Sequence, residues 1–236
     1  MQSDDSPDDV VNWAFNLQGR VPLNWGITAI TLSRAADLLY SRSEAARRFQ
    51  AEVFAVQPGR LVPDPRPLSA DEGELLKDTE LERVAVMLLG MAVENMAKGI
   101  LVGRTPSHVK SGELAKKMTG HDLVGLIKMC EVDLNDTELR ALRFLTEAIR
   151  WTGRYPIPKE AAQLQRLTAG EKMRLSDPAY RECLVRVSAD LLNRLWELLD
   201  AEHSAEKFAE RERLAREESS PNEPHGSKMD DQYESP

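Results

Sequence analysis

The segment ELERVAVMLLGMAVENMAKGILV, residues 80–102, decides the fold class of this chain. Apolar side chains surround the middle of the segment at helical spacing, which is typical of a helix at the centre of a bundle. Gly90 and Gly99 are poor helix formers, and we expect them to let a neighbouring backbone approach closely. Glu94 and Lys98 lie four residues apart, in the order that favours an ion pair. The pair lies either at the rim of the bundle or half-buried with a further partner, because burying both charges is costly.

Helical patterns flank this segment on both sides. Residues 25–56 have one apolar side and follow a potential cap, Asn24, whereas four prolines in residues 57–69 predict a connecting loop. Residues 103–120 are expected to form a loop with at most one helical turn. Two capping boxes are predicted, Ser69 with Glu72 and Thr79 with Glu82. Three further helices are expected: a short one over residues 121–132, one that Asn135 caps and Pro156 ends, and a long one that Pro178 begins.

The composition favours the same fold class. The chain is 42% hydrophobic and 30% charged, as in soluble globular proteins, and it is rich in Leu, Ala, Glu, Arg and Met, which form helices well. We therefore predict an all-α helical bundle with a long C-terminal helix and disordered acidic tails.

The charge distribution divides the chain into three parts. The first ten residues carry a net charge of −4, residues 201–236 carry −5, and the remainder carries +1. We expect a flexible N-terminal segment over residues 1–23, a helical-bundle domain over 24–200, and a charged helix extension with a disordered tail over 201–236. Acidic ends of this kind keep a protein soluble or cover a basic surface.

Several functional classes leave no trace in the sequence. It contains no Gly-rich phosphate loop, no nucleophile elbow, no HExxH and no His/Cys cluster with metal spacing, so we expect no metal and no cofactor. Cys130 and Cys183 are interpreted as thiols buried in a reducing compartment. The N-terminus does not resemble a signal peptide, and the longest apolar run, residues 84–93, is too short to span a bilayer. We expect a cytoplasmic protein without a membrane partner.

An arginine stripe is the first candidate for a binding surface. The spacing of three and four residues places its side chains on one face of a helix, where guanidinium groups can bind phosphate. The alternative is a solvated face laced with salt bridges. The stripe consists of Arg140, Arg143, Glu147, Arg150 and Arg154.

Histidines supply the second group of candidates. His121 follows Gly120 and opens a helix, where it is either a base favoured by the helix dipole or a structural histidine that packs against the bundle. Arg104 and His108 lie in a basic loop, since residues 98–128 carry a net charge of +4. That loop either attracts phosphate by charge or is merely solvated.

Residues 80–158 resemble the HEPN superfamily, the small helical-bundle domains of prokaryotic toxin–antitoxin and antiviral defence modules. The resemblance rests on LLGMAVENMAKGILV, on GHDLVGLIKM and on the ending GRYPIP, in that order along the chain. It implies a HEPN-like core over about residues 80–158. Active members of the family that this chain resembles are metal-independent ribonucleases. In them an Arg and a His, with four to six residues between them, cleave RNA through attack by the ribose 2′-hydroxyl.

The resemblance implies a catalytically degenerate member. Arg154 matches the family's arginine, but positions 159–161 hold Lys, Glu and Ala, and Arg104 and His108 are one residue too close together. We therefore expect binding of an anionic ligand, RNA or a nucleotide, or of a protein partner. The polar site would contain His121 and Arg154, with Arg150, Arg143, Arg104, His108, Glu94 and Lys98 around them. Glu94 would orient His121.

Two other functions stay open. An active metal-independent ribonuclease would need His121 or His108 to meet an arginine across a dimer interface. A purely structural interaction protein would use the leucine stripe of the last helix, between residues 184 and 198, to bind a partner helix. We expect a homodimer through an apolar helix face.

Overall fold

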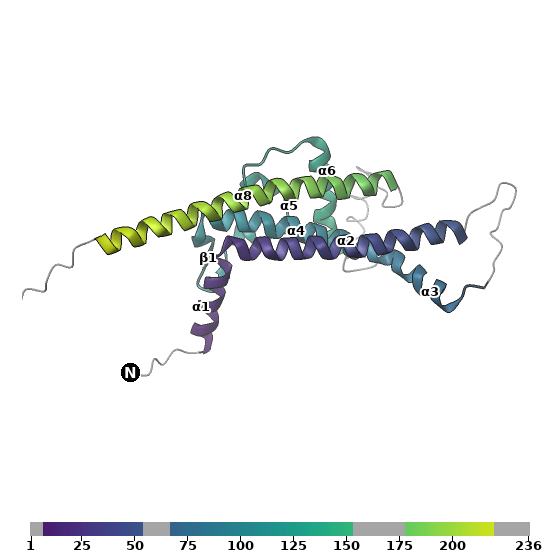
Figure 1. The fold of residues 1–236 in the computed structure, drawn as a ribbon, viewed down its shortest axis with the longest axis horizontal. Helices are drawn as coiled ribbons and strands as arrows, with labels where there is room; N and C mark the ends of the chain where they lie inside the picture. The colour runs from purple at the N-terminus through teal and green to yellow at the C-terminus, as the bar shows by residue number, and fades with distance from the viewer. Residues whose placement is uncertain (1–6, 54–66, 153–177, 220–236) are drawn as a thin grey trace, which may run out of the picture.

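In the part of the chain that the structure describes, the fold is the predicted all-α bundle. It also contains one two-stranded hairpin, which was not predicted. The computed structural model covers all 236 residues and describes residues 7–53, 67–152 and 178–219 (Figure 1). The α-helices and strands, in chain order, are α1 (Pro7–Gly19), α2 (Pro22–Val53), α3 (Ala70–Lys77), α4 (Leu81–Arg104), β1 (Val109–Lys110), β2 (Glu113–Leu114), α5 (Leu123–Met129), α6 (Asp136–Glu147) and α8 (Pro178–Ser219). Short 3₁₀ turns are η1 (Asp78–Glu80), η2 (Pro106–His108) and η3 (Lys116–Met118), and a π-helical turn, η4 (Ala148–Thr152), continues α6.

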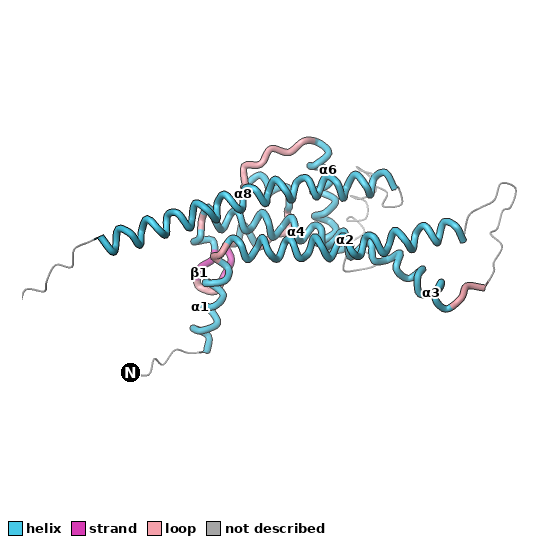
Figure 2. Tube along the Cα trace, viewed as in Figure 1, coloured by secondary structure: helices cyan, strands magenta, loops and turns pink. Residues whose placement is uncertain are grey.

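Helix α4 lies at the centre of the bundle, where the sequence predicts it. The long helices α2 and α8 run along it, and α5, α6 and η4 also pack against it (Figures 1 and 2). Most of its side chains are buried, including those of Val93 and Ile100, which are inaccessible to solvent. The neighbours therefore bury most of the apolar ring, and only a half-buried row is left along one side of the helix, formed by Val84, Met87, Leu88, Met91 and Asn95.

The two glycines of α4 mark close approaches, as expected. A Cβ at Gly99 would lie 2.7 Å from Cδ1 of Leu199 and 3.1 Å from the carbonyl oxygen of Pro22. A Cβ at Gly90 would lie 3.1 Å from the carbonyl oxygen of Leu145. Glycine at these positions lets α2, α6 and α8 contact the backbone of α4.

Two of the predicted helix caps are confirmed. Asn135 accepts hydrogen bonds from the backbone N–H groups of Thr137 and Glu138, and the Glu138 carboxylate accepts one from Asn135. The Ser69 hydroxyl and the Glu72 carboxylate form the same reciprocal pair at the start of α3. These boxes satisfy N–H groups that a helix start leaves without partners.

Two other predicted helix N-termini, at Asn24 and at Thr79, are wrong. Helix α2 begins at Pro22, because proline suits the first helical position, and the side chain of Asn24 donates to the carbonyl oxygen of Gln18 instead of capping. Thr79 lies in a 3₁₀ turn, and its hydroxyl donates backwards to the carbonyl oxygen of Leu76. Glu82 therefore does not form the capping box that the sequence predicts.

The segments expected to be irregular contain more structure than predicted. Residues 7–19, within the segment expected to be flexible, form α1. The loop predicted over residues 103–120 holds η2, η3 and an antiparallel hairpin in which Val109 pairs with Leu114. Ser111 and Gly112 turn the hairpin with positive φ angles of 55° and 75°, a conformation suited to glycine.

The leucine stripe of the last helix is buried within the chain's own core. Leu184, Leu191 and Leu195 are each 2% exposed or less and pack in the core cluster with α4, and Val187 and Leu198 are half-buried against the same cluster. This stripe is therefore not available for the partner helix that the sequence suggested. The charged extension predicted from residue 201 is helical as far as Ser219, and the tail beyond it lies outside the described residues.

One helical stretch, Ala70–Arg104, is long and apolar enough by length and composition to cross a membrane. It includes α3, η1 and α4, and 72% of its most apolar window is buried inside the fold. The buried core helix of a bundle has the same hydropathy, so the packing around α4 accounts for this feature.

We expect Gly99→Ala to destabilise the fold, because the added Cβ would overlap Leu199 and the backbone of α2. The free energy of unfolding should fall by about 1–3 kcal/mol, the usual cost of overpacking, in urea titrations followed by circular dichroism. Gly73→Ala on α3 is the matched control, since a Cβ there meets no atom within 4 Å. It should be neutral or raise stability by up to about 1 kcal/mol, and equal losses in both variants would contradict the packing proposed for Gly99.

Candidate functional site

Glu94, Lys98 and His121 form one polar cluster. Nζ of Lys98 lies 2.5 Å from Oε1 of Glu94, and Nδ1 of His121 lies 2.9 Å from Oε2 of the same carboxylate. Glu94 and Lys98 are each 7% exposed, whereas the side chain of His121 is 40% exposed. The predicted contact between Glu94 and His121 is therefore present, and the ion pair of α4 is buried rather than at the rim.

The Glu94 carboxylate determines which nitrogen of the His121 imidazole carries a proton. A carboxylate paired with an ammonium group can only accept hydrogen bonds, so Nδ1 of His121 is the donor in this contact. The second ring nitrogen, Nε2, then remains available at the half-exposed side of the ring. A histidine held in this way can donate to a ligand when protonated or transfer a proton when neutral.

The start of α5 holds His121 in place. Asp122, the next residue, caps α5 by accepting a hydrogen bond from the backbone N–H of Gly125 at 3.2 Å. The backbone N–H of Leu123 donates to the hydroxyl of Thr146 on α6, also at 3.2 Å. His121 is therefore positioned between α4, which supplies Glu94, and α6.

The arginine stripe flanks this anchor point on α6 and η4. Arg143 lies three residues before Thr146 and therefore on the same side of α6. Arg150 lies four residues after Thr146, within η4. Both arginines are exposed, and Arg150 contacts Glu147 at 3.3 Å. The sequence predicts a regular α-helix here, but Ala148–Thr152 forms a π-helical turn, which alters the spacing beyond Glu147. Arg154 lies outside the described residues.

Arg104, a predicted ligand-binding residue, forms contacts within the fold. Its Nε lies 2.7 Å from Oε1 of Glu202 on α8, and a terminal nitrogen donates to the carbonyl oxygen of Cys130 at 3.0 Å. The hydrogen bond with Glu202 raises the pKa of Arg104 further above its ordinary value. The guanidinium thus ties the ends of α4 and α5 to α8.

His108 lies at the end of η2, where its carbonyl oxygen accepts a hydrogen bond from the backbone N–H of Ala115. Burial, together with the nearby charge of Lys117, lowers the pKa of its imidazole. Among the contacts described for this chain, none joins His108 to Glu94 or His121. The structure therefore does not bring the two predicted histidines into one cluster.

The two thiols differ in their surroundings. Cys130 is buried, and its Sγ donates to the carbonyl oxygen of Ala97, as expected for a core thiol. Burial raises its pKa to about 12, which keeps it protonated and unreactive. Cys183 is half-exposed rather than buried, and both thiols are free.

A second charged cluster, which the sequence did not indicate, lies at the other end of α4. Glu82 is 1% exposed and forms ion pairs with Arg47 of α2 and with Arg181 of α8, the latter at 3.8 Å. Burial raises the pKa of the Glu82 carboxyl, and the two arginines oppose that shift. Tyr40 interacts with Arg181, and burial raises the pKa of its phenol. The feature that could have indicated this cluster is the charge of Glu82 at the start of an otherwise apolar helix.

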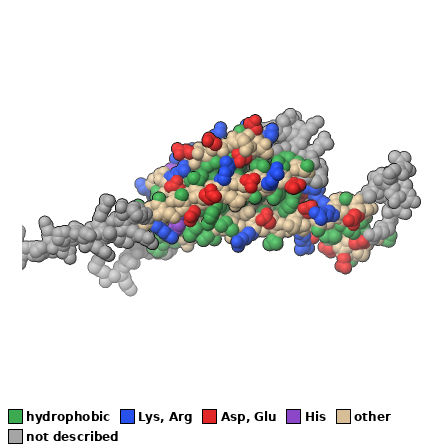
Figure 3. Space-filling view, turned by 45° about the horizontal axis from the view of Figure 1, so that its top comes forward, with side chains coloured by type: hydrophobic (Ala, Val, Ile, Leu, Met, Phe, Trp, Pro, Cys, Tyr) green, Lys and Arg blue, Asp and Glu red, His purple; other side chains and the backbone are tan. Residues whose placement is uncertain are grey.

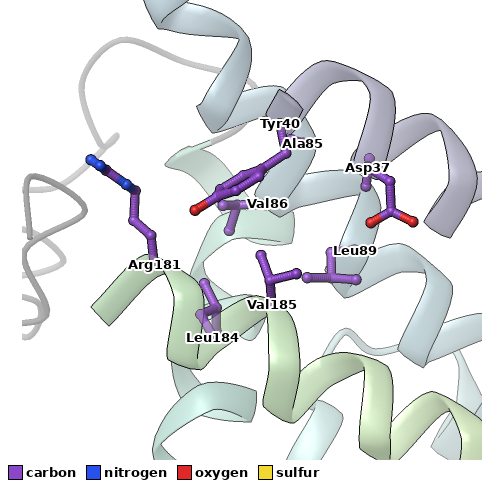
Figure 4. Close-up of a pocket in the computed structure, with 9 residues that line it drawn as sticks. Asp37, Tyr40, Ala85, Val86, Leu89, Arg181, Leu184 and Val185 are labelled. Atoms are coloured by element: carbon purple, nitrogen blue, oxygen red, sulfur yellow. The ribbon is translucent and has the colours of Figure 1, made fainter. Parts of the chain in front are cut away.

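The space beside this cluster does not suit a ligand. Figure 4 shows Tyr40 and Arg181 at one side of a pocket whose remaining wall is apolar except for Asp37. The cavity has a volume of about 10 Å³, which is close to the minimum for a single water molecule. We interpret the Glu82 cluster as a structural clamp between α2, α4 and α8. The wall residues include Ala85, Val86, Leu89, Leu184 and Val185.

Comparisons of the chain with protein-family models, with curated proteins and with solved structures found no match. Within the described ranges, no group of three or more His, Cys, Asp or Glu side chains is arranged to hold a metal ion. The Glu94–His121–Lys98 cluster, with its half-exposed imidazole, is therefore the candidate that the geometry itself selects.

We expect Glu82→Ala to reduce the free energy of unfolding by about 3–5 kcal/mol, because it leaves the buried guanidinium of Arg181 and the half-buried one of Arg47 without their carboxylate. Glu80→Ala is the matched control, since Glu80 is 74% exposed and its contact with Arg83 is long, at 3.4 Å. That variant should lose less than about 1 kcal/mol. Thermal and urea unfolding measure both, and similar losses in the two variants would show that the Glu82 cluster does not clamp the bundle.

Proposed function

We propose that this chain is a HEPN-like, catalytically degenerate binding module for a phosphate-bearing ligand, either RNA or a nucleotide. His121 would contact the phosphate through Nε2, and Arg143 and Arg150 would neutralise the ligand's charge. Arg154, which lies outside the described residues, stays a predicted member of the site.

The contact between Glu94 and His121 carries this proposal. A buried ion pair is usually no more stable than apolar side chains of the same volume, so stability alone gives little reason to place Glu94 and Lys98 inside the bundle. The pair does, however, hold an imidazole from another helix in one orientation at the surface. Groups arranged in this way are common at functional sites.

The charges of the cluster suit an anion. Lys98 balances Glu94, so a proton on His121 would add a positive charge that no buried carboxylate cancels. Arg143 and Arg150, on the neighbouring side of α6 and η4, would add two guanidinium groups, which bind phosphate with strong charge-assisted hydrogen bonds. The site would therefore recognise phosphate through one imidazole and two arginines.

We expect His121→Ala to weaken binding of a fluorescein-labelled single-stranded RNA by about tenfold or more, because one charge-assisted hydrogen bond contributes about 1.5–3 kcal/mol. Arg150→Ala should have a similar effect. Fluorescence polarisation at two salt concentrations measures both, and a fluorescent adenosine nucleotide in a parallel titration separates the two ligand classes. Arg48→Ala on α2 is the control, since Arg48 is exposed and its ion pair with Glu44 is a contact within one helix.

Binding of neither ligand by the wild-type chain would refute the proposal. Equal affinities of the wild type and of His121→Ala would remove His121 from the site. Equal losses in all three variants would indicate nonspecific attraction by surface charge.

An active metal-independent ribonuclease is the second candidate. The observation that favours it is again the carboxylate–imidazole contact, since a histidine with Nδ1 bound to a carboxylate can act as a base through Nε2. Nε2 would take the proton of the ribose 2′-hydroxyl, whose oxygen attacks the adjacent phosphorus while the bond to the 5′-oxygen breaks. The leaving 5′-oxygen would take a proton from water. The products would end in a 2′,3′-cyclic phosphate and a 5′-hydroxyl.

For this candidate we expect RNA cleavage that persists in EDTA and falls by about 100-fold or more in His121→Ala, as when a general base is lost. Glu94→Gln should also slow cleavage, since the amide no longer orients the imidazole as a carboxylate does. Gel analysis of a labelled RNA, with DNA of the same sequence as the control, measures the reaction. Absence of cleavage, or cleavage that His121→Ala leaves unchanged, would refute it.

A further inference from the structure

A groove on the surface of the bundle lies apart from the cluster around Glu94. The groove runs between α2 and α8 with Met96 of α4 at its base. Its volume is about 280 Å³, close to the lower end of the range for small-molecule pockets, about 300–1,000 Å³. Met96 lies two residues after Glu94, which places it on nearly the opposite side of α4. The groove is therefore separate from the site proposed above.

Apolar side chains form the base and one wall of the groove. Ala29, Met96 and Leu192 line it and are each 8% exposed or less. Trp196 is half-buried, and its ring lies against α2, because a Cβ at Gly26 would come within 2.9 Å of its Cζ3 atom. On the face of the bundle shown in Figure 3, apolar side chains lie exposed between charged ones. The groove thus presents an apolar base and an aromatic wall that the fold holds in place.

Three polar side chains line the same groove, and none of them has a partner within the described residues. The hydroxyls of Thr28 and Thr31 on α2 each donate to the carbonyl oxygen four residues earlier, at 2.9 Å. The hydroxyl of Ser33, on the same helix, makes no such bond within the ranges that the structure describes. Arg34 and Asn193 likewise form no side-chain hydrogen bond or ion pair with any described residue. These groups are therefore free to contact a ligand.

A buried hydroxyl lies next to the groove. Ser188 is 1% exposed and lies four residues before Leu192, on the same side of α8. Its Oγ has no hydrogen-bond partner in the part of the chain that the structure describes. Buried hydroxyls in proteins are nearly always hydrogen-bonded. The Ser188 hydroxyl is therefore an independent sign that this side of α8 accommodates a polar atom from outside the chain.

We propose that this groove is a second ligand site, which binds small organic anions with a flat apolar body, such as aromatic carboxylates. Arg34 is the one charged residue among the described residues that line the groove, and it is exposed, so a carboxylate can pair with its guanidinium. The apolar body of the ligand lies on Met96 and contacts the indole of Trp196, where ring–ring contact stabilises it. Ser33 supplies a further hydrogen bond to the polar end.

An organic cation is the alternative ligand. Asp190 and Glu197 lie three residues before and four residues after Asn193, so they belong to the same side of α8. Neither of them lines the groove, whereas Arg34 does. The charge at the groove itself therefore favours an anion.

Three ligands with the same apolar body and different charges test this proposal: phenylpropanoate, phenylpropanol and phenylpropylammonium. Each is titrated into the isotope-labelled full chain, and NMR follows the indole N–H signals. The chain has four tryptophans, and the signal of Trp196 is the one that Trp196→Phe removes. We expect the carboxylate to shift that signal saturably with a Kd of about 1 mM or lower. The alcohol and the ammonium ligand should bind about fivefold more weakly, since they lack the ion pair with Arg34.

Variants of the groove residues separate the two parts of the proposal, with calorimetry as the second measurement. Arg34→Ala should remove the preference for the carboxylate. Trp196→Ala should weaken all three ligands, whereas Trp196→Phe keeps a ring and should bind nearly as the wild type does. Arg48→Ala is the matched control, because Arg48 is an exposed arginine of α2 outside the groove, and its affinities should be those of the wild type. Circular dichroism melting confirms that each variant is folded.

Three outcomes would overturn the proposal. The first is that the carboxylate causes no saturable shift of the Trp196 signal. The second is that the alcohol or the ammonium ligand binds as tightly as the carboxylate or more tightly. The third is a preference for the carboxylate that survives Arg34→Ala. None of these outcomes depends on whether the chain binds RNA or a nucleotide at His121.

Discussion

Burial of α4 along its length is the constraint on which the rest of the structure depends. A charge buried on such a helix must be satisfied from within the protein, because little water reaches it. Three charged residues of α4 are buried, and each has partners: Glu94 with Lys98 and His121, and Glu82 with two arginines. These ion pairs therefore accompany the apolar packing and limit which neighbouring helices can cover each part of α4.

The two clusters differ in how they meet solvent. Around Glu82, the carboxylate and Arg181 are both nearly inaccessible, and the adjoining cavity is too small for more than about one water molecule. Around Glu94, the cluster reaches the surface through His121. Both are buried ion pairs of the same helix, but only the second has a group that a ligand can contact. This difference, rather than the presence of charge, selects the candidate site.

Local signals in the sequence were sufficient for much of the fold and for part of the site. The apolar ring of residues 80–102, the glycines at close approaches and the cap at Asn135 each depend on neighbours along the chain or on one helix face. The contact between Glu94 and His121 was also predictable, because a half-buried Glu–Lys pair needs a further partner and a histidine was available nearby. The physical requirement of charge compensation therefore extended the prediction beyond local structure.

Other features depend on contacts between residues far apart in the chain, which no local pattern encodes. Glu82 resembled a capping residue, and only the approach of Arg47 and Arg181 from two other helices makes it part of a clamp. Arg104 resembled a ligand-binding residue in a basic loop, but Glu202 lies 98 positions away in sequence and occupies its guanidinium.

Helix α1 was missed for a related reason. Its apolar residues fall at spacings of two, so they face more than one side of the helix, and none of them packs into the core that fixes the other helices. Its orientation comes from polar contacts with the hairpin and with Trp25, which the sequence does not reveal. His121 is likewise held by a polar contact, since Glu94 keeps the imidazole in one orientation. A group that is ordered before its ligand arrives lowers the entropic cost of binding.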